Sequence, residues 1–417
     1  HNAGAEVTTG VQNTLIGGLA GDALTDADNN VAIGQFSLST DTLGSNSVAV
    51  GRAALISQNF TTATDTYNTA VGYGAGYAVT TGINNTLIGG LAGDALTDGD
   101  NNVALGTSAL GTETRADRNV AVGSYALATQ NIGTDTDTYN TAVGHLAGYL
   151  VTTGVNNTLI GALAGDALTD ADHNTAVGRG SLGADTLGSR ATSIGFGALS
   201  SQNFTTATDT YNTAVGFNAG VLVSTGTQNT FFGGSAGSNI TTGTQNVYVG
   251  YAPSGSAVGN AREIVIGNGV GAGSNSARFI TTGGSLSIAI DGSTTSWTAA
   301  SDSRLKKDVT DSTVGLEFIK DLRPVTFKWN SKNAIADSLP QYDADSSDPV
   351  YGEGKAHHGF IAQEVKTVID AHSDVVNGHN IWVEDPDGTQ QVAPAALVPM
   401  LVKAIQELEA RIATLEG

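Results

Sequence analysis

The chain has 417 residues, enough for more than one domain, and it combines 55 glycines with only 14% charged residues. It contains no cysteine, which excludes disulfides and thiolate metal sites. Its formal net charge of −21 disfavours binding to a nucleic-acid backbone, so we expect no nucleic-acid partner. No run of about 18 apolar residues occurs, so the sequence predicts no membrane span.

A short pattern recurs along the first two-thirds of the chain: a β-branched residue, a spacer, a large apolar residue and then glycine. Thr14-Leu15-Ile16-Gly17 is one example. The pattern glycines lie at 17, 34, 51, 72, 89, 106, 123, 144, 161, 178, 195, 216, 233, 250 and 267. Their spacings of 17, 17, 21 and 17 repeat as a superperiod of 72 residues. A fixed period of this kind predicts a parallel β-roll or solenoid of about fifteen rungs.

Each rung is expected to contain one short strand that ends at the glycine. The residues on either side of the spacer share one face of the strand, and the spacer, usually Ala, faces the other side. Because both faces are apolar, we expect both to be covered. The glycine fits a positive φ or a close approach of two backbones. Asn lies four residues before the glycine in twelve rungs, which favours turns or a stacked Asn ladder, with a ligand role as the alternative.

A small residue follows most of these glycines, as Ala20, Ala92 and Ala126 show. We expect this row to let three chains approach a common axis. The arrays resemble the β-roll heads of trimeric autotransporter adhesins and, more closely, the Asn-Thr-Ala-Val-Gly arrays of phage and bacterial tail-fibre proteins. The resemblance covers about residues 13–267 and implies a homotrimer. Residues 1–10 match residues 73–82, so we also expect natural sequence upstream of His1.

The 21-residue intervals contain four extra residues that are expected to protrude as loops. Residues 57–67 and 201–211 have the same sequence, and residues 129–139 are a divergent copy. Aromatic residues in these loops are candidates for contact with a ligand, with packing over a neighbouring rung as the alternative for Phe60 and Phe204. The candidates are Phe60, Tyr67, Tyr139, Phe204 and Tyr211.

Pairs of aspartates recur two residues apart, and oxygen ligands with this spacing suit calcium. The pairs are Asp26 and Asp28, Asp98 and Asp100, Asp135 and Asp137, and Asp170 and Asp172. No complete calcium-binding loop accompanies them, so solvated turns are the favoured interpretation, and we expect no other metal or cofactor. The array weakens after Gly250, and residues 268–300 are interpreted as a β neck.

The composition changes at Ser301, where the first lysines of the chain occur. Residues 301–309, 315–329 and 358–365, followed by a terminal helix, resemble in order and spacing the C-terminal intramolecular chaperone domain of phage endosialidases and tail fibres. The resemblance covers residues 301–417. It implies that the chain cuts itself at Ala300-Ser301, with Ser301 as the nucleophile and Lys306 as its base, in a single-turnover serine autopeptidase. A serine hydroxyl needs such a base, and a lysine can supply it. The alternative for both residues is an exposed turn.

Four further polar residues of this region are expected to lie outside the cleavage chemistry. His357 and His358 are interpreted as structural, because a Ser-Lys dyad needs no histidine. Gln363 and Glu364 are expected to pack or to hydrogen-bond. The terminal segment 397–416 has apolar residues at alternating spacings of three and four, which predicts a coiled coil. These residues are Val398, Leu401, Ile405, Leu408, Ile412 and Leu415. The family resemblance favours a trimer.

The sequence thus predicts a mainly β protein: a β-roll shaft over 1–267, a neck over 268–300 and a small α+β domain over 301–417. Our leading hypothesis is a homotrimeric phage tail-fibre shaft with a self-releasing chaperone, located on the virion tail and binding a host-surface receptor or glycan. The alternative is a bacterial surface or secreted adhesin of the same architecture. A carbohydrate-degrading spike is a third hypothesis, and the absence of clustered carboxylates in the sequence weighs against it.

Overall fold

The computed structural model describes residues 2–281, 284–290, 298–299, 301–339, 341–351, 354–375, 380–385 and 388–416. The chain is mainly β and forms two compact units, His1–Ala300 and Ser301–Gly417. Each unit is described by itself.

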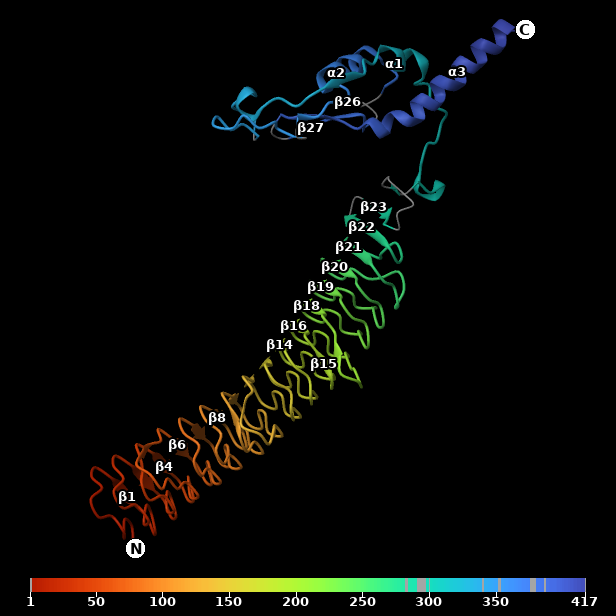
Figure 1. Cartoon of the computed structure of the whole chain (residues 1–417). Coiled ribbons are helices and arrows are strands. Elements are labelled where there is room, and N and C mark those ends of the chain that lie inside the picture. The colour runs from red at the N-terminus through yellow and green to blue at the C-terminus, as the bar shows by residue number, and fades with distance from the viewer. Residues whose placement is uncertain are drawn as a thin grey trace. The chain divides into compact units, whose positions relative to one another are not determined.

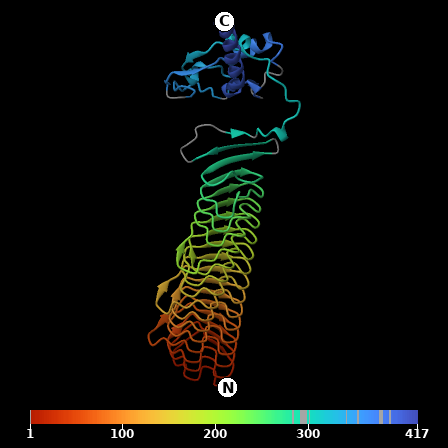
Figure 2. The same cartoon turned by 90° about the vertical axis from the view of Figure 1, so that its right-hand side faces the viewer.

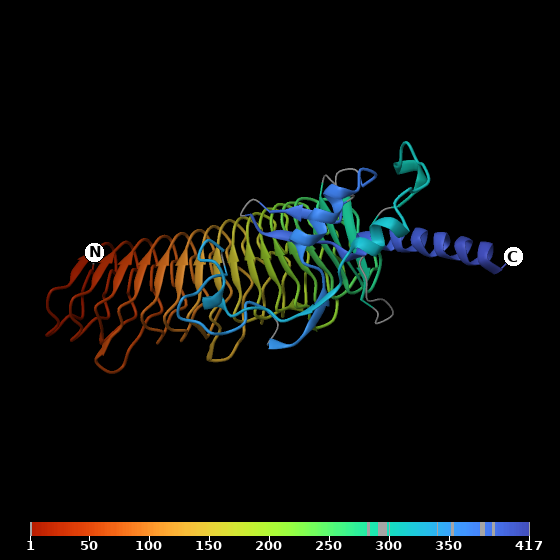
Figure 3. The ribbon, with the colours of Figure 1, turned by 90° about the horizontal axis from the view of Figure 1, so that it is seen from above.

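The first unit is a parallel β-solenoid whose rungs stack along one axis (Figure 1). One three-residue strand lies in almost every rung, directly before its glycine. These strands are β1 (Thr14–Ile16), β2 (Val31–Ile33), β4 (Val48–Val50), β6 (Thr69–Val71), β7 (Thr86–Ile88), β8 (Val103–Leu105), β10 (Val120–Val122), β12 (Thr141–Val143), β13 (Thr158–Ile160), β14 (Thr175–Val177), β16 (Thr192–Ile194), β18 (Thr213–Val215), β19 (Thr230–Phe232), β20 (Val247–Val249) and β21 (Glu263–Gly267). Seen from above, the same rungs repeat side by side along the unit (Figure 3).

Strand pairing in the solenoid is parallel and in register with the sequence repeat. Thr14 pairs with Val31 and Ile16 with Ile33, one 17-residue period apart. Across a 21-residue interval the register holds as well, because Val50 pairs with Val71. The four extra residues are therefore accommodated outside the strand row, as the repeat predicts.

The extra residues form a second, short strand that pairs with the preceding rung. The pairs are β3 (Gly44–Ser45) with β5 (Thr64–Asp65), β9 (Ala116–Asp117) with β11 (Thr136–Asp137), and β15 (Gly188–Ser189) with β17 (Thr208–Asp209). Figure 2 shows these short arrows along one edge of the stack. They repeat once in each superperiod of 72 residues.

The two faces of the strand row have different environments. The spacer residue points inward and is fully buried, as Ala32, Ala104 and Phe231 show. The flanking residues point outward and are half-buried or exposed; Ile88 and Ile160 are each 38% exposed. The expectation that both faces are covered is wrong for a single chain, because the solenoid encloses only the spacer face.

The glycine that ends each strand is required for two reasons at once. Gly51 has φ of +133°, a conformation that side chains rarely adopt. A Cβ added to it would lie 2.3 Å from the carbonyl oxygen of Gly72 in the next rung. Both explanations predicted for this glycine therefore hold.

The asparagines form a buried ladder along the solenoid. The backbone N–H of Asn30 donates to Oδ1 of Asn13 at 2.9 Å, and Asn102 donates to Asn85 in the same way. The side-chain amide reaches one rung further, where Asn30 Nδ2 donates to the carbonyl of Gly44 at 2.9 Å. Each asparagine thus satisfies polar backbone groups that would otherwise be buried without a partner. The ladder interpretation is confirmed.

The row of small residues does not face a common axis. Ala20, Ala92 and Ala126 are fully buried inside the core of their own chain. These positions hold small residues because leucine side chains from other parts of the rung fill the narrow interior. A Cβ added to Gly21, next to Ala20, would lie 2.8 Å from the side chains of both Leu15 and Leu24. The expectation that this row forms the contact among three chains is wrong.

The solenoid ends in a β neck. β21 pairs in parallel with β22 (Ser276–Thr281), which then pairs antiparallel with β23 (Gly284–Ala289), and β23 pairs with β24 (Thr298–Ala299). Glu263 takes the asparagine position in the last rung, where its carboxylate accepts from Tyr248 at 2.8 Å and from Gly273 N at 2.7 Å. Burial, together with the bond to Glu263, raises the pKa of the Tyr248 hydroxyl.

The second unit is a small α+β fold. Its elements are η1 (Ser303–Leu305), α1 (Leu316–Asp321), β25 (Val325–Phe327), η2 (Lys332–Ala334), β26 (His357–Gly359), α2 (Ala362–Ala371), β27 (Trp382–Glu384), β28 (Gln390–Val392), η5 (Pro394–Leu397) and α3 (Val398–Glu416). A compact core joins the helices through Phe318, Val365, Ile369 and Met400. Glu407 on α3 accepts from Leu316 N at 2.9 Å and so caps the start of α1.

Candidate cleavage site and association surfaces

Ser301 and Lys306 meet at the start of the second unit. Lys306 Nζ lies 2.8 Å from Ser301 Oγ, within hydrogen-bonding distance. The short η1 turn between them reverses the chain, and Lys306 N donates to Ser303 O at 3.2 Å. A serine hydroxyl in contact with an amine has the geometry of a nucleophile and its base. The structure therefore brings together the two residues that the resemblance assigned to cleavage.

Asp302 holds the turn that carries this pair. Its carboxylate accepts from Arg304 N at 2.9 Å, which caps the turn, and it also binds the Arg304 guanidinium at 2.6 Å. Hydrogen bonds from Arg304 hold the pKa of the Asp302 carboxyl below its usual value. The hydrogen bonds described for the Asp302 carboxylate go to Arg304 and not to Ser301 Oγ, so we treat Asp302 as a positioning residue. Ala300, on the other side of the bond assigned to cleavage, lies outside the described residues.

Helix α3 exposes the apolar residues that the coiled-coil pattern predicted. Its other side is buried, where Met400 and Ala404 pack into the unit. The exposed row consists of Val398, Leu401, Ile405, Leu408, Ile412 and Leu415. Ile405 is 65% exposed, and an exposed apolar row of this kind on a helix is typical of association surfaces.

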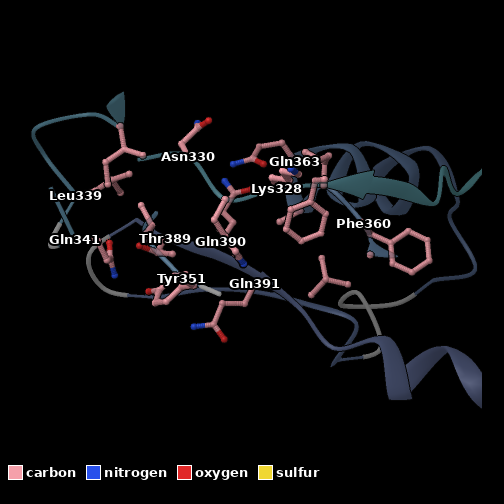
Figure 4. Close-up of a pocket in the computed structure, with 18 of the residues that line it drawn as sticks. Lys328, Asn330, Leu339, Gln341, Tyr351, Phe360, Gln363, Thr389, Gln390 and Gln391 are labelled. Atoms are coloured by element: carbon pink, nitrogen blue, oxygen red, sulfur yellow. The ribbon is translucent and has the colours of Figure 1, made fainter. Parts of the chain in front are cut away.

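The predicted histidine and glutamine residues lie in or beside a cavity of about 640 Å³ in the second unit (Figure 4). His358 and Gln363 line it, together with Gln390 and Gln391 from β28. His357 instead packs with its ring 5.7 Å from that of Phe327. Glu364 forms an ion pair with Arg323, with a 2.9 Å contact to its Nε. Ser301 and Lys306 do not line this cavity, so these residues are separate from the dyad.

The loop aromatics divide into two groups. Tyr67, Tyr139 and Tyr211 are about half exposed. Tyr139 donates to Asp137 at 3.0 Å, and the Arg118 guanidinium lies 5.9 Å from its ring centre. Arg190 and Asp209 surround Tyr211 in the same way. Ligand contact by these tyrosines stays a prediction.

Phe60 and Phe204 are only 7% exposed, which favours the packing alternative over ligand contact for these two side chains. Their backbone N–H groups donate to buried carboxylates at 3.0 Å, Phe60 to Asp41 and Phe204 to Asp185. These bonds fold the start of each loop over the solenoid. The alternative interpretation, packing over a neighbouring rung, is the one that the structure shows.

The aspartate pairs bond to the preceding rung. Asp28 Oδ1 accepts from Val11 N, and Asp100 Oδ1 accepts from Ile83 N, both at 2.7 Å. Within the described ranges, no three His, Asp or Glu side chains converge as a set of metal ligands. Calcium binding by the pairs stays a prediction.

Three buried polar networks were missed from the sequence. In each, a carboxylate accepts from a glutamine one rung later, and that glutamine accepts from a ladder asparagine. Gln58 donates to Asp41 at 2.6 Å, and Asn68 donates to Gln58 at 2.9 Å. The other two networks are Glu113, Gln130 and Asn140, and Asp185, Gln202 and Asn212. All nine residues are buried, and each carboxylate supports one 21-residue rung.

The described helices include none with the length and apolar content that crossing a bilayer requires.

Comparison with protein families matches residues 301–374 to a family named as a peptidase and described as the chaperone of endosialidase. Neither the comparison with curated proteins nor that with solved structures gave a match. A long parallel β-solenoid followed by this domain defines a fibre-like architecture. The chain therefore combines β-solenoid repeats with a C-terminal region that matches the chaperone-of-endosialidase family over residues 301–374, as the sequence resemblance predicted.

Proposed function

We propose that the chain is the shaft of a homotrimeric phage tail fibre whose C-terminal domain aligns three copies and then cuts itself free between Ala300 and Ser301. The observation that carries the proposal is the 2.8 Å contact between Lys306 Nζ and Ser301 Oγ at the first residues of the matched domain. The boundary between the two units falls at the same bond, so cleavage there would separate shaft from chaperone.

The proposed reaction uses only groups of the chain and water. Lys306 acts as the base that takes the proton of Ser301 Oγ, and this oxygen attacks the carbonyl carbon of Ala300. The Ala300–Ser301 C–N bond breaks, and the Ser301 nitrogen takes up a proton and becomes a free amine. The Ala300 carboxyl is then held as an ester on Ser301 Oγ, and water hydrolyses this ester. Because the nucleophile and the scissile amide belong to one residue, each molecule reacts once.

Two apolar surfaces support the trimer. One is the exposed row on α3. The other is the outward face of the solenoid strands, where the residue before the glycine is exposed by more than a third in many rungs. These residues include Ile16, Ile88, Ile160, Ile194, Phe232 and Ile266. A single soluble chain rarely exposes an apolar strip of this length, and two further copies of the chain would cover it.

The proposed setting is the virion tail, and the proposed partner is a receptor or glycan on the host surface. The matched chaperone-of-endosialidase domain supports this setting, because it is the feature by which the sequence resembles phage tail fibres. After release of the chaperone, a folded trimer would have no route to refold, which is a form of kinetic stability.

Denaturing gels and mass spectrometry of the expressed full chain test the cleavage. We expect wild type and the matched control Ser303→Ala to give fragments 1–300 and 301–417, and Ser301→Ala and Lys306→Met to stay intact. Light scattering on intact Ser301→Ala should give three times the chain mass of 42.1 kDa. An uncut wild-type trimer, or Ser301→Ala cut at the same bond, would contradict the proposed peptidase.

A further inference from the structure

The residues directly after the solenoid glycines form a row on the outside of the solenoid. Comparison of the rungs shows which side chains this position accepts without a change of fold. The row reads Gly18, Gln35, Arg52, Tyr73, Gly90, Thr107, Ser124, His145, Ala162, Arg179, Phe196, Phe217, Gly234, Tyr251 and Asn268. Rungs with Gly, Thr, Ser or Ala here pair in the same register as rungs with aromatic residues. The fold of a rung therefore does not require an aromatic side chain at this position.

Large apolar residues gather at one end of this row, in the rungs next to the neck. Phe196 and Phe217 stack with ring centres 5.5 Å apart and planes 12° from parallel. Tyr251 lies beside Gly234 and extends the row, and Phe232 directly precedes its own glycine. The exposed fractions are 48% for Phe196, 58% for Phe217, 56% for Phe232 and 72% for Tyr251. We call these four residues the aromatic patch.

The aromatic patch is exposed although the interior of the same rungs is already filled. Phe231 and Tyr248 occupy that interior, stacked at 5.8 Å and fully buried. Rings left in water forfeit roughly 25 cal/mol for each Å² of apolar surface that a partner would cover. Three of the four patch side chains are phenylalanines, which offer no polar atom to a sugar hydroxyl. An apolar partner fits this chemistry.

The 72-residue superperiod creates a specific need for such a surface. Residues 57–67 and 201–211 are identical, and the strand residues repeat with little change. Three shafts displaced by one superperiod, about 19 Å, would therefore still place similar strands side by side. The aromatic patch occurs once in the row, so only aligned copies bring all four rings to the same level. Closed rotational symmetry would then place each ring next to its equivalents.

We propose that the aromatic patch is a self-association surface, occupied by the same patch of two further copies, and that it fixes the lengthwise alignment of the three shafts. The inference rests on the proposed trimer. It adds which part of the shaft recognises its own copies. The exposed strand residues Ile194 and Ile266 lie in the first and last of the rungs that end at Gly195 to Gly267, the same stretch of the solenoid that carries the patch.

Chemical crosslinking of the uncleaved Ser301→Ala chain tests this alignment. The chain has no cysteine, so Thr107→Cys introduces a single thiol in the outward row, far from the patch. Aligned copies present this thiol at one level, and a short bismaleimide should join them. Phe196→Ser with Phe217→Thr should lower the crosslinked fraction at least about fivefold, while light scattering still shows a trimer held by α3. Arg52→Ser with Tyr73→Thr, the same change on adjacent rungs at the other end, should leave crosslinking unchanged.

Folding of each variant is checked by protease resistance, and Phe232→Val provides a second variant because Val already precedes Gly216 and Gly250. It should lower crosslinking to an intermediate level. A parent chain that is monomeric would overturn the proposed function itself. A trimeric parent whose patch variants crosslink like the control would overturn only this inference. Unchanged crosslinking with loss of binding to a host polysaccharide would assign the patch to a glycan instead.

Discussion

The shaft and the C-terminal unit reach stability in opposite ways. In the shaft, one rule repeats: the core is a continuous row of Ala, Leu and Val, and hydrogen bonds join residues 17 apart from rung to rung. The C-terminal unit has no repeat, a small core around Phe318 and Met400, and most of α3 in contact with solvent. The difference teaches that a repetitive fold can fill its interior from a single chain, although both parts leave one apolar surface exposed.

The largest effect is expected on the association surface of the C-terminal unit. Ile405→Asp would place three carboxylates together in the proposed coiled coil, where burial of unpaired charge is highly unfavourable. We expect loss of the trimer, measured by light scattering on the uncleaved chain. Gln406→Asp, one residue further and equally exposed, is the matched control and should remain trimeric. Trimers from both variants would show that α3 does not hold the copies together.

A smaller effect, on the rate of the proposed cleavage, is expected from changes at Asp302. Asp302→Ala removes the cap of the turn between Ser301 and Lys306. We expect cleavage to slow about five- to tenfold, followed as fragment formation over time. Asp302→Asn should recover most of the rate, because Asn also caps turns. Arg304 lowers the pKa of Asp302, so the loss in the alanine variant should be the same at every pH from 5 to 8. Wild-type rates for Asp302→Ala would refute its positioning role.

Within the shaft, the buried networks should matter more than its exposed carboxylates. Asp185→Asn places an amide among donors from Gln202, Gly188 and Phe204, and it should lower the free energy of unfolding by about 1–3 kcal/mol. Thermal unfolding of the uncleaved chain measures this change. Asp135→Asn, in an exposed loop, should change stability by less than about 0.5 kcal/mol. Equal effects would mean that the network adds nothing specific.

The smallest expected effect concerns the carboxylates of the middle superperiod. Burial, and then the nearby carboxylates of Asp100 and Asp135, raise the pKa of Asp117. The folded state therefore binds a proton before the unfolded state does, so this group destabilises the shaft at neutral pH and less so as the pH falls toward 4. Asp117→Ser copies Ser45 and Ser189, which keep the inter-rung hydrogen bond.

We expect Asp117→Ser to raise shaft stability at pH 7 by less than about 1 kcal/mol, because solvent screens this partly exposed site. The gain should shrink toward pH 4, measured by thermal unfolding across that range. Ser189→Asp, the reverse change one superperiod later, should lower stability at pH 7. A gain that grows as the pH falls would contradict the assigned cause.

The sequence predicted the features that depend on local geometry. Strand positions, the glycine at positive φ and the Asn ladder follow from period-two alternation and turn preferences. The family resemblance, and not the spacing alone, identified Ser301 and Lys306 as a pair that the structure brings into contact. Whether a surface lies inside or outside was harder to predict. Ala20 and its equivalents were assigned to a contact between chains because a small residue fits either a narrow core or a close interface.

The position of Phe60 was hard to predict for a related reason. Its backbone N–H donates to the buried carboxylate of Asp41. An aspartate is expected at the surface unless its position in the repeat is compared with the equivalent position in other rungs, where Val79 and Leu96 are buried. The sequence signal for the buried networks is therefore the seventh residue after each glycine, which is apolar in some rungs and Asp, Glu or Gln in others.

The buried networks also determine how such a shaft changes length. Each network takes its carboxylate from one rung and its glutamine and asparagine from the 21-residue interval that follows, so these two neighbouring rungs form one unit. Loss of the 17-residue rung that carries the carboxylate would leave a buried glutamine without its acceptor. The rungs with Val79 or Leu96 at the same position belong to no such network, so either can be lost or repeated alone. Shafts built on this plan should therefore vary in length by single rungs at those positions, and by paired rungs where a carboxylate and a glutamine meet.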